Sequence, residues 1–194
     1  MRAGFALGDD YVGVLRTNLR SPLARRRILA LRGVVRQNLV ASDDWRLALA
    51  DPDVDVRREA LNQIAHAQIE DDAIYVALMD LLNDVDALVV DGAVFALGEH
   101  LFVGAVDQMC VIATSHVDAR CRESAIAALG AIGDDRARLA ILAALDDKPP
   151  VRRRAIVALS NFEGPDIDEA LTRASEDRDW QVRAAVNQLG RDPD

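Results

Sequence analysis

Residues 118–134, DARCRESAIAALGAIGD, contain one complete copy of a short pattern that recurs along this 194-residue chain. The pattern is a small apolar residue, an Arg, two polar residues, an Ala, an apolar residue, any residue, a small residue, a Leu and a Gly. Its Leu or Ile recurs every 30 to 33 residues, at Leu31, Ile64, Leu97, Leu129, Leu159 and Leu189. A fixed period of this length indicates a stack of identical supersecondary units.

Each copy is predicted to form an A helix followed by a B helix. Apolar residues recur at spacings of three and four, as in Leu139, Leu142 and Ala143, which is typical of amphipathic helices. One pair of helices cannot cover its own apolar stripe, so neighbouring pairs must bury it together. We therefore expect an all-α fold, a right-handed α-solenoid of about six two-helix repeats with the B helices on its concave side. The expected single domain, 1–194, has units at about 10–33, 36–66, 72–99, 105–131, 135–161 and 166–190.

Proline and glycine are found at the predicted starts and ends of these helices. Ser21-Pro22 and Asp51-Pro52 each place a capping acceptor before a proline, which is expected at the first helical position. Four glycines fall near the ends of B helices, where a left-handed residue closes the last turn; they are Gly33, Gly98, Gly130 and Gly190.

Composition narrows the class of partner and the location. The net charge is −9 and the pI about 4.8, which argues against nucleic acid because phosphate binding needs clustered cations. We find no signal peptide and no apolar run of membrane-spanning length, and the two cysteines fit a reducing compartment as inert thiols. The sequence therefore predicts a cytoplasmic protein with no membrane partner.

The charge is unevenly distributed along the chain. Residues 1–33 carry a net charge of +5, which leaves −14 for the remainder. Between Arg58 and Arg120 there is no Lys or Arg, whereas eleven acidic residues occur there. The middle of the stack is thus expected to present an acidic surface.

Four strings resemble HEAT repeats and, more narrowly, the short bacterial subtype found in phycobilisome lyases. They are DVDVRREALNQIA (53–65), DARCRESAIAALGAIGD (118–134), PPVRRRAIVALS (149–160) and WQVRAAVNQLG (180–190). The resemblance covers nearly the whole chain and specifies an architecture. It does not specify an activity, because the subtype occurs in lyases and in adaptors alike.

The resemblance implies a structural role for the recurring Asp and Arg. In HEAT repeats the Asp before a B helix and the Arg in its first turn pair within and between units as a charge ladder. The expected ladder residues are Asp55 with Arg57, Asp118 with Arg122, Asp147 with Arg152, and Asp179 with Arg183. The third unit reads Leu88-Val89-Val90-Asp91 and lacks the Arg, a divergence that marks either a site or sequence drift.

Helical spacing places the third, fourth and seventh residues of the pattern on the concave face. Apolar side chains at the seventh position, bordered by charges, are typical of a partner-binding strip, with Phe95 as its anchor. The alternative is that these side chains pack between neighbouring B helices. The candidate binding residues are Leu29, Asp91, Phe95, Glu99, Glu123, Ala127, Arg153 and Val157.

The three histidines, His66, His100 and His116, fall in the acidic stretch. A metal site needs three or four converging ligands. HEAT-type deoxyhypusine hydroxylases bind two irons through repeated His-Glu dipeptides, whereas this chain has one reversed pair, Glu99-His100. We therefore expect solvated histidines at helix ends, with no metal and no cofactor.

The pattern favours a non-catalytic scaffold or adaptor that binds a protein or peptide with a basic segment on its acidic concave face. A variant is head-to-tail self-association, in which the cationic first unit of one copy docks on the acidic middle or tail of another. A bilin lyase or isomerase is the alternative, and a HEAT-fold DNA alkylpurine glycosylase is a minor one that the acidic charge opposes. The two tryptophans, Trp45 and Trp180, are expected in the core or at a repeat edge.

Overall fold

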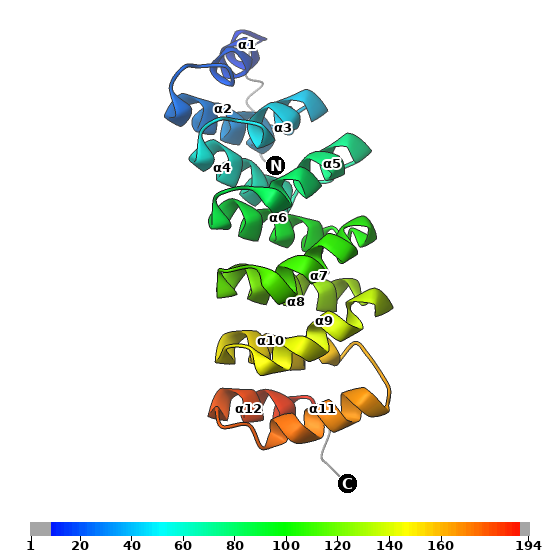
Figure 1. The fold of residues 1–194 in the computed structure, drawn as a ribbon. Helices are drawn as coiled ribbons and strands as arrows, with labels where there is room; N and C mark the ends of the chain where they lie inside the picture. The colour runs from blue at the N-terminus through cyan, green and yellow to red at the C-terminus, as the bar shows by residue number, and fades with distance from the viewer. Residues whose placement is uncertain (1–8, 191–194) are drawn as a thin grey trace, which may run out of the picture. The chain divides into compact units, whose positions relative to one another are not determined.

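The computed structural model describes residues 9–190, and all regular structure within that range is helical (Figure 1). This confirms the predicted all-α class and its succession of short helices. Contacts between Cα atoms divide the chain into two compact units, Met1–Leu81 and Leu82–Asp194. The handedness of the solenoid and the single-domain organisation stay predictions.

The first unit buries a core of leucine and isoleucine between its helices. Helix α2 packs on α1 and α4, and α3 packs on α4 and α5. Leu31, Leu61 and Leu78 are at most 1% exposed. The helices are α1 (Asp9–Asn18), α2 (Ala24–Arg36), α3 (Ser42–Leu49), α4 (Val54–Ile64) and α5 (Asp72–Asp80).

The second unit arranges its helices in two layers. The B helices α6, α8, α10 and α12 pack successively on one another, while α7 packs on α8 and α9, and α11 packs on α10 and α12 (Figure 1). The α-helices are α6 (Ala87–Glu99), α7 (Val106–Ser115), α8 (Ala119–Ile132), α9 (Arg138–Ala143), α10 (Pro149–Leu159), α11 (Pro165–Ser175) and α12 (Trp180–Gln188). Short 3-10 helices are η1 (Leu81–Asn83), η2 (Val103–Ala105), η3 (Asp135–Ala137) and η4 (Ala144–Asp146).

Aspartate side chains cap the N-termini of most B helices. The carboxylates of Asp53, Asp86, Asp118 and Asp179 each accept the backbone N–H two residues further on, which satisfies one of the donors that a helix start leaves open.

The expected caps before two prolines are wrong. Helices α2 and α4 begin two residues after Pro22 and Pro52, at Ala24 and Val54. Ser21 Oγ and Asp51 Oδ1 instead accept the N–H groups of Leu23 and Asp53, at 3.3 and 2.9 Å. These acceptors shape the turn that precedes each helix, because each turn extends two residues further than the prediction allowed.

The glycine prediction is confirmed for Gly190, whose φ is +66°, and is wrong for the other three. Gly33, Gly98 and Gly130 are buried inside helices. A Cβ on Gly98 would lie 2.7 Å from the Cβ of Ala128, and a Cβ on Gly130 would lie 2.5 Å from that of Ala158. Glycine is therefore required where adjacent B helices of the second unit approach closely, not at a helix end.

Candidate functional site

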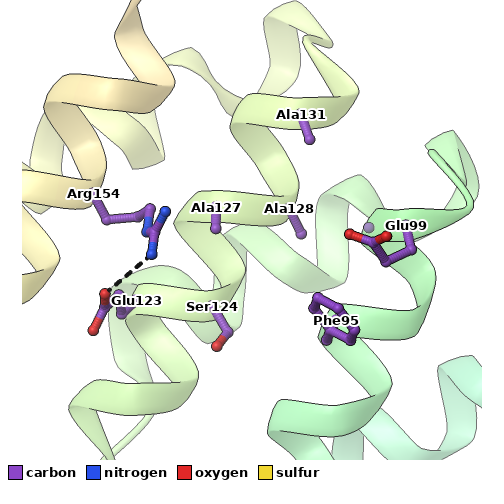
Figure 2. Close-up of a pocket in the computed structure, with 9 residues that line it drawn as sticks. Phe95, Glu99, Glu123, Ser124, Ala127, Ala128, Ala131 and Arg154 are labelled. Atoms are coloured by element: carbon purple, nitrogen blue, oxygen red, sulfur yellow. Dashed lines mark ion pairs between the residues drawn. The ribbon is translucent and has the colours of Figure 1, made fainter. Parts of the chain in front are cut away.

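A groove lies on the B-helix layer of the second unit, and we call it the Phe95 groove (Figure 2). Helix α6 supplies one wall, α8 supplies the floor, and α10 contributes one arginine on the far side. The groove has a volume of about 320 Å³. Its lining residues are Phe95, Gly98, Glu99, Glu123, Ser124, Ala127, Ala128, Ala131 and Arg154.

A second groove, the Trp180 groove, lies between α10 and α12 and has a volume of about 290 Å³. Arg154 lines both grooves, so the two adjoin along the same layer of helices. The lining residues of the Trp180 groove are Arg153, Arg154, Val157, Trp180, Gln181, Ala184, Ala185 and Gln188.

Each groove combines an alanine-rich floor with an exposed aromatic ring. Phe95 is 47% exposed and Trp180 is 67% exposed. Alanines on α8 and α12 leave room beside these rings because their side chains end at Cβ. An aromatic ring that stays accessible beside such a depression can contribute a large share of a binding energy.

Four of the predicted binding residues meet in the Phe95 groove, namely Phe95, Glu99, Glu123 and Ala127. Arg153 and Val157 line the Trp180 groove instead. The third, fourth and seventh places of the repeat thus reach one helix layer in the second unit, as the spacing of a helix requires.

The other two predicted residues lie elsewhere. Asp91 lines neither groove, since its carboxylate accepts a hydrogen bond from the Ser124 hydroxyl on the next B helix. Leu29 is 55% exposed on α2 of the first unit.

The sequence interpretation missed Trp180 as a groove residue. Trp45 is buried at 4% exposure, as expected for a core residue, whereas Trp180 is largely exposed at the first position of α12. A tryptophan directly after a capping Asp starts a helix, where few turns are available to cover it. Its position directly after the capping Asp is the sequence feature that could have indicated the exposure of Trp180.

The ladder exists, but its acidic members differ from those expected. Arg122 pairs with Asp147 and Arg152 pairs with Asp177, each through two nearly parallel N–H···O bonds of 2.6 to 2.8 Å. In the first unit Arg27 pairs in the same way with Asp51, at 2.6 and 2.7 Å. The planar guanidinium matches both carboxylate oxygens and thereby connects each of these three repeats to the one that follows it.

The third nitrogen of each guanidinium binds within its own repeat. Arg122 Nη1 donates to the carbonyl oxygen of His116 at 2.7 Å, and Arg152 Nη1 donates to that of Asp147 at 2.8 Å. Arg57 and Arg183 make the equivalent bond to the carbonyl oxygens of Asp51 and Asp177. One arginine therefore fixes the turn before its own helix and also the turn of the following repeat.

These contacts show that two predicted pairs are wrong. Arg122 pairs with Asp147 and not with Asp118. Arg152 binds the carbonyl oxygen of Asp147 and not its carboxylate. Asp118 caps α8 and contacts Arg120, and Asp179 caps α12. Asp55 pairs with Arg58, at 3.2 Å. The acid just before a B helix is engaged by the helix N-terminus, so the arginine reaches across to the next repeat. The recurring separation of 24 or 25 residues between Arg and acid was the signal for this.

The third repeat replaces both members of the ladder pair. Val90 stands four residues after the capping Asp86, where Arg122 stands relative to Asp118. His116 stands two residues before Asp118, where Asp177 stands relative to Asp179, and its Nδ1 accepts the Asp118 N–H at 3.1 Å. Val90 is 1% exposed. The missing arginine is matched by a missing acid, so the divergence of this repeat belongs to its structural face.

Electrostatics differ between the ladder and the grooves. Side-chain hydrogen bonds from Arg122 and Arg152 hold the pKa values of Asp147 and Asp177 below the ordinary value of 3.8. In the Phe95 groove, Glu123 and Arg154 approach to 3.5 Å with 24% and 43% of their side chains exposed (Figure 2). The ladder pairs are short and largely enclosed, whereas the groove pair is long and open to water.

The histidines occupy three different settings. His66 is exposed just after α4, His100 ends α6, and His116 belongs to the turn before α8. Among residues 9–190 no three His, Cys, Asp or Glu side chains converge in a way that would hold a metal ion. Both cysteines are free thiols; burial raises the pKa of Cys121 to about 11.

Comparisons with known proteins agree with this architecture. Residues 106–190 match the family model of HEAT repeats. A designed armadillo repeat protein, solved in complex with the peptide (KR)4, is 17% identical over 92% of this chain and 97% of that chain, with a TM-score of 0.68. One chain from the structure of the CpcE–CpcF complex of phycocyanin lyase from Nostoc sp. PCC7120 is 21% identical over 90% of this chain and 74% of that chain, with a TM-score of 0.65.

YibA of Escherichia coli is similar as well, at 20% identity over 93% of this chain and 68% of that chain, with a TM-score of 0.68. No curated protein matches the sequence. At these identities the likeness shows the fold alone. Residues 106–190 therefore match HEAT repeats, and the chain has a helical-repeat fold of the armadillo and HEAT type, which confirms the resemblance to HEAT repeats found in the sequence.

Between residues 9 and 190, every helix falls short of the length and apolar character that crossing a bilayer requires.

Proposed function

We propose that this chain is a non-catalytic binding module that holds an extended segment of a partner protein along its B-helix layer, across the Phe95 and Trp180 grooves. The observation that carries the proposal is the pair of adjoining grooves, each with an exposed aromatic ring beside an alanine floor. Extended peptides gain affinity when alternate side chains enter such depressions. The peptide bound to the similar designed armadillo protein supports this use of the fold.

The predicted basic segment fits the Phe95 groove, because Glu99 and Glu123 are among its lining residues. Asp91 is left out of the proposed contact surface because Ser124 engages it. The lyase alternative rests on a likeness of fold to the CpcE–CpcF complex, so no particular residue of this chain supports it. Self-association through the cationic first unit stays a variant of the binding hypothesis.

The test is selection of random ten-residue peptides, displayed on phage, on the whole chain. Peptides recovered on the wild-type protein should lose at least about tenfold in affinity with Phe95→Ala, because exposed aromatic anchors dominate such contacts. Fluorescence anisotropy with the selected peptides measures the affinity.

The matched control is Leu139→Ala, which removes an apolar side chain that is 79% exposed on α9 and lines neither groove. Its affinity should equal that of the wild type. Recovered peptides that respond to Leu139→Ala and not to Phe95→Ala would place binding on another face and contradict the proposal.

A further inference from the structure

We propose that the segment bound by this module is dipolar: a Lys or Arg side chain enters the Phe95 groove, and an Asp or Glu side chain enters the Trp180 groove. The inference deepens the function proposed above and depends on it. It adds a requirement that a basic segment alone does not meet, namely a second charge of opposite sign at a defined spacing.

The charges that line the two grooves are sorted by sign. Glu99 and Glu123 lie on α6 and α8, whereas Arg153 and Arg154 are neighbours on α10. No acidic residue lines the Trp180 groove, and the Phe95 groove has one cation, Arg154, at its edge. The groove surface thus changes from acidic to basic across α8 and α10.

The two signs are joined by one ion pair that is easily separated. Glu123 Oε1 and Arg154 Nη2 are 3.5 Å apart, and both side chains remain in contact with water. Exposed pairs of this kind contribute about 1 kcal/mol or less. By contrast, Arg153 Nη1 donates to the amide oxygen of Gln181 at 3.1 Å, so its charge has a neutral partner.

Because Glu123 and Arg154 already pair with each other, the contribution of each ligand charge to the affinity depends on whether the other charge is present. A ligand with only a basic group would draw Glu123 away and leave Arg154 without its carboxylate. A ligand with only an acidic group would draw Arg154 away and leave Glu123 without its guanidinium. A ligand with both exchanges one internal pair for two intermolecular pairs, so it loses nothing and gains one pair.

The geometry sets the spacing of the two ligand charges. Packed helices lie about 8–10 Å apart, and an extended chain advances about 3.3 Å per residue. Charges three residues apart therefore span one B helix to the next. The apolar residues between them face Ala127 on one side and Val157 on the other, which line the two grooves.

The experiment uses the peptides selected on the wild-type protein. It determines which charged residues they contain and how replacing these residues changes the affinity. The recovered peptides should be enriched in a basic and an acidic residue three or four positions apart. Replacing either charge by Gln should weaken binding about fivefold, the equivalent of one exposed ion pair. Replacing both should weaken it by less than the product of the two single effects, because the internal pair then re-forms.

Protein variants test whether the acidic residue of the peptide binds in the Trp180 groove. With Arg153→Gln/Arg154→Gln, replacing the acidic residue of the peptide should no longer change the affinity, and replacing the basic residue still should. The control, Arg173→Gln/Arg178→Gln, removes the same charge from exposed positions outside both grooves. It should leave both effects as in the wild type.

Selected peptides that depend on Phe95 but carry only basic residues, or charges whose effects simply multiply, would overturn the dipolar requirement and leave the binding function standing. Peptides that do not depend on Phe95 would overturn both.

Discussion

The third and fifth repeats solve the same structural problem with opposite chemistry. At the ladder position the fifth repeat has Arg152, whose side chain is 5% exposed and pairs with Asp177, while the third has the buried Val90 with His116 in the acid's place. Both arrangements leave no buried charge without a partner. The comparison teaches that the stack requires complementary partners at this position and does not require an ion pair, in keeping with the small net value of such pairs.

The groove faces of the same two helices differ in another way. Helix α6 presents Phe95 and Glu99, and α10 presents Arg153, Arg154 and Val157. These side chains make no ladder contact. One B helix therefore has a structural face, where enclosed partners must match in the next repeat, and a groove face, where the contacts between repeats are longer and open to water.

The largest expected effect comes from breaking the ladder pair of the fifth repeat on one side. Arg152→Val leaves the largely enclosed carboxylate of Asp177 without its guanidinium, which should lower the free energy of unfolding by about 3 kcal/mol. The double variant Arg152→Val/Asp177→His copies the third repeat and should recover most of that loss. Urea denaturation of the whole chain measures both. A double variant as unstable as the single one would show that the third repeat relies on something other than its matched pair.

A smaller effect tests what the repeats share, the contact between glycine and alanine on adjacent B helices. Gly130→Ala places a Cβ 2.7 Å from the Cα of Ala158, which only a shift of backbone relieves. We expect a loss of about 2 kcal/mol in unfolding free energy.

The control for this change is Gly13→Ala, inside α1, where a Cβ meets nothing within 4 Å. It should stabilise the chain by about 0.5–1 kcal/mol, because alanine is the better helix former. If thermal unfolding shows the same change in stability for both variants, the close approach of Gly130 to Ala158 does not contribute to the stability.

The smallest effect is in the pH dependence of the charged ladder pairs. The pKa of Asp177 is lowered in the folded chain, so its contribution is present above its ordinary value of 3.8 and is lost as the pH falls through the lower folded pKa. Asp177→Asn should therefore be less stable than wild type at pH 7, and the gap should narrow below about pH 3.8. Denaturation curves at several pH values check this, and a gap independent of pH would exclude the carboxylate as its cause.

Much of the site was accessible from the sequence within one helix layer. The period of the repeat placed Phe95, Glu99, Glu123 and Ala127 on one face, and they meet in one groove. Trp180 was missed because the repeat pattern does not show whether the first residue of α12 is covered by the neighbouring repeat. Asp91 was misplaced because Ser124, 33 residues away, takes up its carboxylate. Neither the exposure of Trp180 nor the contact of Asp91 follows from the spacing of residues along a single helix.

The sequence by itself determined the helical class, the length of the repeat and the face of each B helix, because these depend on local periodicity and on residues close in the chain. Only the tertiary structure decided which acid each arginine binds, why the buried glycines are needed and where the two grooves adjoin. These features arise from contacts between residues about 25 to 33 positions apart, where packing selects one of several partners that the repeat pattern allows equally.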